Sequence, residues 1–117
     1  MFKSNVWYDH LPDYVDRAFK YAREADPHAL LFYNDYNSIQ NKEKRGKIIK
    51  MIKSMQEKKV PIDGMGIQFH VDATGGNLSR ENIAETIKSF GELGLQVHIT
   101  EMDVGCPSCT NGHNEIK

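Results

Sequence analysis

The sequence predicts an α/β fold in which roughly three parallel strands alternate with helices. Three short apolar segments, 29–33, 64–69 and 95–100, start roughly 30 to 35 residues apart, which is the spacing of βα units. A segment with helical periodicity precedes each of them. Parallel neighbours need a crossover connection of this kind, so the pattern favours a parallel sheet.

The first predicted helix runs from Leu11 to Ala25. Apolar residues recur there at three- and four-residue steps, as in an amphipathic helix: Leu11, Val15, Ala18, Phe19, Ala22 and Ala25. Pro12 suits the first turn, where its missing N–H costs nothing. The helix should end at Asp26-Pro27, because the residue before a proline is disfavoured in the α region.

The first predicted strand, Ala29 to Tyr33, is almost entirely apolar, as expected for a strand covered on both faces. A polar cluster follows it directly, Asn34-Asp35-Tyr36-Asn37. The second helix is indicated by the helical period of Ile48, Ile49, Met51, Ile52 and Met55. Its lysines predict a solvated face rather than a nucleic-acid patch: Lys42, Lys44, Lys47, Lys50 and Lys53.

The second predicted strand is 64–69, and it ends at Gln68 and His70. Ser79 predicts the N-cap of a third helix, because its hydroxyl can accept from a backbone N–H of the first turn. That helix should close at Gly94, where left-handed geometry favours glycine. Its apolar face holds Ile83, Ile87, Phe90 and Leu93.

The third predicted strand, 95–100, ends at Glu101 and Asp103. In parallel α/β folds, ligands and catalytic groups collect at the C-terminal strand ends, so polar side chains there should converge on one site. Taken singly, Glu101 would be interpreted as a cap or loop-tip carboxylate and His70 as a hydrogen-bonded structural histidine. Their equivalent places at neighbouring strand ends favour a functional interpretation.

Strand alternation predicts which side chains face that site. It places Ile99 and Glu101 on one side of the third strand and His98 on the other. If the sheet curls into a barrel, Glu101, Gln68 and His70 point into its mouth. His98 then points toward the helices and is interpreted as structural.

Three segments, in this order and spacing, resemble signatures of glycoside hydrolase family 10: Asn34-Asp35-Tyr36-Asn37, Pro61-Ile62-Asp63-Gly64-Met65-Gly66-Ile67-Gln68-Phe69-His70 and Val97-His98-Ile99-Thr100-Glu101-Met102-Asp103. The segment 14–27 resembles the helix before the first signature. The resemblance implies an eight-stranded (β/α) TIM barrel, with 1–117 a partial catalytic domain that supplies about strands five to seven. It also implies the activity of an endo-1,4-β-xylanase, the retaining hydrolysis of internal β-1,4-xylosidic bonds in xylan.

The resemblance also implies roles for single residues. Glu101 matches the catalytic nucleophile, an ionised carboxylate that forms a covalent glycosyl-enzyme. His70 and Asp103 match a hydrogen-bonding network that orients that carboxylate and keeps it charged. Substrate-facing positions are matched by Gln68, Tyr36 and Asn37. No cofactor and no metal site are implied, and the expected ligand is xylan or a xylo-oligosaccharide.

The chain departs from the family pattern in what is missing. Retaining hydrolysis needs a second carboxyl group about 5 to 5.5 Å from the first, and the family's acid/base glutamate follows an asparagine on a strand that would precede Trp7. The chain's Asn114-Glu115 lies on the wrong side of the nucleophile. We therefore expect 1–117 to be inactive alone and to need the missing barrel strands. A non-catalytic carbohydrate-binding remnant is the alternative, whereas a doubly wound module is disfavoured because no G-x-G-x-x-G occurs.

Composition excludes some partners and leaves the compartment open. The net charge of −1 gives no footprint for nucleic acid, and no run of about eighteen apolar residues predicts a membrane span. The first residues open no signal peptide, so an extracellular location is expected from the family resemblance alone. Cys106 and Cys109 lie in an expected flexible loop, 105–117; a loop disulfide is favoured over free thiols or half of a zinc site with His113.

Overall fold

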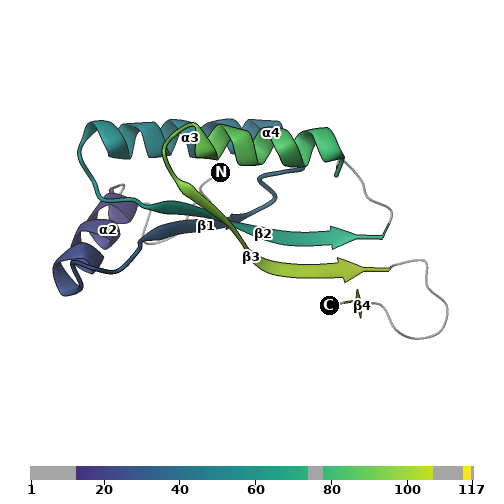
Figure 1. Cartoon of the computed structure of the whole chain (residues 1–117), viewed down its shortest axis with the longest axis horizontal. Helices are drawn as coiled ribbons and strands as arrows, with labels where there is room; N and C mark the ends of the chain where they lie inside the picture. Colours follow the sequence, from purple (N-terminus) through teal and green to yellow (C-terminus); the bar gives the residue numbers. More distant parts are fainter. Residues whose placement is uncertain (1–12, 74–77, 107–114, 117) are drawn as a thin grey trace.

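The computed structural model describes residues 13–73, 78–106 and 115–116, and its described residues confirm the predicted alternation of helices and parallel strands (Figure 1). Strand β1 pairs in parallel with β2, and β2 pairs in parallel with β3. The short β4 pairs antiparallel with the end of β3. The elements are α2 (Tyr14–Ala25), β1 (Phe32–Tyr36), α3 (Lys42–Glu57), β2 (Gly64–Asp72), α4 (Arg80–Gly91), β3 (Gln96–Gly105) and β4 (Glu115–Ile116).

Helices α3 and α4 cover one face of the sheet, and the core lies between them and β2 (Figure 1). Ile48 and Ile52 from α3 and Phe90 from α4 pack there against Met65 and Ile67 of the strand, and all five are fully buried. Burying one such side chain stabilises the fold by about 1.5–3 kcal/mol. This face of β2 therefore fixes the helices, while the opposite face can carry polar groups.

The helix boundaries differ slightly from the predicted ones. Helix α2 begins at Tyr14 and ends at Ala25, and Pro12 lies outside the described residues. The predicted N-cap of α4 is confirmed, because the Asn82 N–H donates to the Ser79 hydroxyl at 3.0 Å. Helix α4 ends at Gly91, three residues before the predicted glycine. Gly94 instead takes its left-handed φ of 81° in the turn toward β3.

An arginine–aspartate pair joins α2 to the sheet. The Arg23 guanidinium lies 2.7 Å from the Asp63 carboxylate and donates to the Ala29 carbonyl at 2.6 Å. The same Asp63 oxygen accepts from the Leu31 N–H, at 2.8 Å. Strand β1 begins at Phe32 rather than at the predicted Ala29, because Ala29 bonds back to Asp26 and Arg23, and Leu31 bonds to Asp63 before β2.

The strands continue further into polar sequence than predicted. Parallel pairing runs on through Tyr36↔Gln68 and through His70↔Asp103, so β2 ends at Asp72. Backbone hydrogen bonds make these pairs, and they do not require apolar side chains. The polar residues expected in loops after the strands therefore lie on the sheet itself, on a rigid support.

Cys106 follows β3 directly and is both buried and disulfide-bonded. The chain's other cysteine, Cys109, and His113 fall outside the described residues. Of the expected flexible loop 105–117, the structure describes Gly105 at the end of β3 and the pair Glu115–Ile116 in β4. None of the helices in the described part of the chain has the length and apolarity to cross a membrane.

Candidate active site

Four polar side chains at the C-terminal ends of β2 and β3 form a connected cluster. His70 is its centre: Nδ1 lies 2.6 Å from Oδ2 of Asp103, and Nε2 lies 2.8 Å from Oε2 of Glu101. The Gln68 side-chain oxygen is 3.2 Å from the same Nε2. The predicted convergence of Gln68, His70, Glu101 and Asp103 is therefore confirmed, and all four are partly open to solvent.

The hydrogen bonds of this cluster favour the protonated form of the His70 imidazole. When both carboxylates are ionised, they can only accept, so both ring nitrogens of His70 must carry a proton. The hydrogen bond that the ring donates to Asp103, and then the one to Glu101, raise the pKa of His70 above its ordinary value of 6.5. The two carboxylates therefore stabilise the protonated form of the His70 ring.

A β-bulge decides which side of the sheet Glu101 occupies. Ile67 is in register with Ile99, but the next residue, Gln68, is in register with Glu101, so Thr100 is an extra residue in β3. Because side chains alternate, a shift of one residue exchanges the two faces of a strand. Glu101 consequently lies on the face of Gln68, opposite to the face of Ile99.

The predicted orientation of His98 is wrong for the same reason. His98 is in register with Gly66, and its ring lies 4.6 Å from the ring of Phe32 between centroids. Gly66 shares its face with Gln68, so His98 lies on the face of the cluster and not toward the helices. Simple alternation along β3 failed because it assumed an uninterrupted strand.

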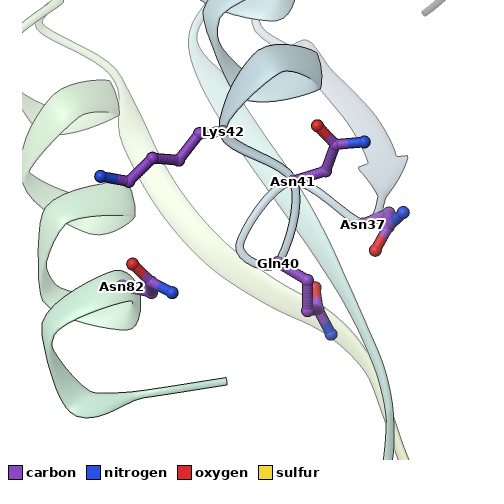
Figure 2. Close-up of a pocket in the computed structure, with 5 residues that line it drawn as sticks. All are labelled: Asn37, Gln40, Asn41, Lys42 and Asn82. Carbon is purple, nitrogen blue, oxygen red and sulfur yellow. The ribbon is translucent and has the colours of Figure 1, made fainter. Parts of the chain in front are cut away.

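The two other predicted substrate-facing residues lie in different places. Tyr36 is in register with Gln68, which is in register with Glu101, so its side chain belongs to the face of the cluster. Asn37 follows β1 with a left-handed φ of 63°. Its side chain lines a polar hollow of about 590 Å³ between the start of α3 and α4 (Figure 2); the other lining residues are Gln40, Asn41, Lys42 and Asn82.

Lys44 orders the end of β1 and does not belong to the solvated lysine face predicted for α3. Its ammonium is 2.9 Å from the Asp35 carboxylate and 3.4 Å from the centroid of the Tyr36 ring, and its side chain is only 10% exposed. Burial, together with Asp35, raises the pKa of Tyr33, so this phenol stays protonated and donates to Asp35 at 2.8 Å. No signal in the sequence distinguishes Lys44 from its neighbours.

We expect Asp103→Asn to lower the pKa of His70 more than Glu101→Gln does, because the bond to Asp103 contributes most to the raised value. The folded pKa is raised, so the stabilisation from His70 is full below the unfolded value of about 6.5 and is lost as the pH rises through the folded value. Histidine NMR titrations of the chain and both variants measure this. Equal pKa values in all three proteins would contradict the cluster geometry.

Comparison with known proteins places this geometry in a family. The profile described as Glycosyl hydrolase family 10 matches residues 1–116. Endo-1,4-beta-xylanase B of Thermotoga neapolitana is 45% identical over 107 residues, which are 91% of this chain and 30% of that protein.

Solved structures of xylanases share the fold. Xylanase 10B from Thermotoga petrophila, in complex with xylobiose, is 40% identical with a TM-score of 0.87, over 96% of this chain and 34% of that one. A variant of xylanase 10C from Cellvibrio japonicus, in complex with xylopentaose, is 43% identical with a TM-score of 0.75, over 89% of this chain and 21% of that one. The 117-residue chain thus spans about a third or less of each of these relatives. It belongs to glycosyl hydrolase family 10 and forms part of that family's (β/α) barrel.

Proposed function

We propose that this chain supplies the nucleophile half of the active site of an endo-1,4-β-xylanase. The observation that carries the proposal is the His70 imidazole joined to Glu101 and Asp103 at the ends of β2 and β3. Family membership supports the hydrolysis of glycosidic bonds in xylan. The xylobiose and xylopentaose complexes of the two xylanases support a xylo-oligosaccharide as the ligand.

The proposed reaction is a double displacement at the anomeric carbon. Because Nε2 of His70 holds Oε2 of Glu101, we assign the attack to Oε1. A bond forms between that oxygen and the anomeric carbon while the glycosidic bond breaks, and its electron pair goes to the leaving oxygen, which a second carboxyl group protonates. Water, deprotonated by the same second group, then displaces Glu101, and the anomeric configuration is retained.

The remaining cluster residues would orient the nucleophile and the sugar. Asp103 orients the imidazole ring through Nδ1, so Nε2 stays directed at Glu101. The Gln68 amide lies beside the same nitrogen and would reach a sugar hydroxyl next to the bond that breaks. The Tyr36 ring would bind a sugar further along the chain, because its place in β1 puts it on the face of the cluster. The Asn37 amide would bind one from the polar hollow that it lines after β1.

An extracellular location is part of this proposal. Polymeric xylan does not cross a membrane, and the disulfide-bonded Cys106 is typical of an oxidising compartment. Xylanase activity in the culture medium of the source cells, rather than in their lysate, would support this location. Activity confined to the lysate would contradict it.

The direct test completes the barrel around this chain. In the protein called the completed barrel below, residues 13–106 replace the matching segment of xylanase 10B from Thermotoga petrophila, whose structure covers 96% of this chain. We expect the completed barrel to release short oligosaccharides from soluble xylan. Proton NMR of the first products should show the β-anomer. A folded completed barrel without activity contradicts the proposed function, and an α-anomer as first product contradicts the mechanism.

We expect the 117-residue chain alone to show no measurable turnover of xylan. The double displacement needs a second carboxyl group about 5 to 5.5 Å from Glu101, and the family places that group on a strand outside this chain. A reducing-sugar assay measures the turnover, with the completed barrel as positive control. Turnover by the chain that Glu101→Gln abolishes would contradict the prediction. Binding of xylo-oligosaccharides together with an inactive completed barrel would favour a carbohydrate-binding remnant.

A further inference from the structure

We propose that Thr100 and Asn34 form a latch across β2 that holds the β-bulge in place and thereby keeps Glu101 on the face of His70. The Thr100 hydroxyl donates to Oδ1 of Asn34 at 2.6 Å, across 66 residues of sequence and from β3 to β1. Both are positioning residues, since they act through Glu101. Only the catalytic consequence of the latch rests on the proposed function.

The bulged register of β3 requires an interaction that stabilises it over the uninterrupted register. In an uninterrupted register, Thr100 would lie opposite Gln68, and Glu101 would lie opposite Phe69 and face the helices. Such a register pairs every residue of the strand, whereas a bulge leaves one unpaired. Within the described residues, the pairing of β3 with β4, at Val104 and Gly105, lies beyond the bulge.

Two glycines of β2 allow side chains of β1 and β3 to meet over it. A Cβ at Gly66 would lie 2.7 Å from Oδ1 of Asn34 and 2.8 Å from Cγ2 of Thr100, closer than real contacts allow. Two residues earlier in β2, a Cβ at Gly64 would overlap the ring of Phe32, and that ring in turn contacts the ring of His98. Glycine in a strand interior marks such a close approach.

Of the two contacts that cross β2 over its glycines, only one involves the bulge. The contact of Phe32 with His98 joins residues that lie before the bulge, where the register is regular. The bond from Thr100 engages the extra residue itself, next to Glu101. In an uninterrupted register Thr100 would face the same side but lie level with Gln68, two residues beyond Gly66. In the bulged register its side chain lies over Gly66, where its hydroxyl reaches Asn34. The latch therefore selects the register that brings Glu101 and His70 together.

The first experiment measures the latch in the 117-residue chain, without reference to catalysis. Thr100→Val keeps the shape of the side chain but removes its donor, and Thr100→Ser keeps the donor. We expect histidine NMR titration to give a lower pKa for His70 in the valine variant, because Glu101 and Asp103 then shift out of hydrogen-bonding distance of its ring, and the original pKa in the serine variant. Ser89→Ala, which removes an exposed hydroxyl bonded within α4, serves as control.

The second experiment measures catalysis in the completed barrel. Thr100→Val should lower kcat, and the rate at which a fluoro-xylobioside labels Glu101, by about 10- to 100-fold, because a nucleophile displaced by about 1 Å loses this much. KM should change less than about twofold, since the sugar subsites stay intact. Asn34→Ala should give the same loss, and the double variant should lose no more than either single one.

Each outcome supports or overturns the latch. An unchanged pKa of His70 in the valine variant overturns it, as do additive losses from Thr100→Val and Asn34→Ala. A serine variant that behaves like valine also overturns it, because the hydroxyl would not be what matters. If the valine variant does not fold, Asn34→Ala decides the question with β3 unchanged. If the completed barrel is inactive before any substitution, the proposed function fails while the NMR titration still decides the latch.

Discussion

Replacing Glu101 by glutamine in the completed barrel is expected to lower kcat for xylan by about 10⁴-fold or more, the scale seen when a nucleophile is removed. The amide has nearly the shape of the carboxylate but cannot form the covalent glycosyl-enzyme. It can also donate a proton where only an acceptor suits Nε2 of His70, which lies 2.8 Å from the carboxylate oxygen. Initial rates with soluble xylan measure the loss.

The control for this substitution is Glu43→Gln on α3. The Glu43 side chain is 82% exposed, and among the described residues its one ion pair is with Lys47, so its replacement should leave kcat unchanged.

A fluoro-xylobioside should label Glu101 in the completed barrel. The His70→Ala variant should turn over xylan more slowly, while its Glu101 can still be labelled. Label on any other residue, or full activity of the glutamine variant, would show that Glu101 is not the nucleophile.

The strand order and the residues of the cluster could be predicted from the sequence because both depend on local signals. Apolar runs at βα spacing identify the parallel strands, and the first polar side chains after each run mark the C-terminal edge. His70, Glu101 and Asp103 meet as expected. The pairing of strand ends needs only the rule that parallel neighbours finish on the same edge.

The face of Glu101 was predicted correctly relative to His70 but for a reason that the structure overturns. Alternation along β3 would place Glu101 with Ile99, whereas the extra residue Thr100 separates their faces. The interaction that we propose to stabilise this bulge is the hydrogen bond from Thr100 to Asn34, 66 residues away in the sequence. A local sequence pattern cannot predict a contact of that range. His98 was assigned to the helix side by the same assumption.

Buried charge was the other feature that periodicity could not reveal. Lys44 and Arg45 lie beside exposed lysines in α3, and the pattern of apolar residues treats them alike. Their burial depends on groups from other elements: the Asp35 carboxylate for Lys44, and the Thr86 hydroxyl for Arg45. A helical period identifies the buried face of a helix, but long-range partners decide which charged side chain can enter it.

Replacing Arg45 by methionine is expected to lower the free energy of unfolding by about 3 kcal/mol, the largest stability loss that we predict. The side chain is buried, and its Nη1 donates to the carbonyls of Ser38 and Ile39 and to the hydroxyl of Thr86, at 2.8–3.2 Å. Methionine fills much of the space but leaves these buried acceptors without a donor. Urea denaturation of the 117-residue chain, followed by circular dichroism, measures the change.

Two matched variants separate the geometry of Arg45 from its charge. Lys47→Met removes an exposed cation of the same helix, paired with Glu43 at 3.5 Å, and should change stability by less than about 0.5 kcal/mol. Arg45→Lys keeps the charge, but its ammonium ends one bond short of the place of Nη1, and it has no second nitrogen to pair with Glu85, which lies 3.4 Å from Nη2. We expect it to recover less than half of the loss. Full recovery by lysine would mean that charge alone, and not the geometry of the guanidinium, ties this loop to α4.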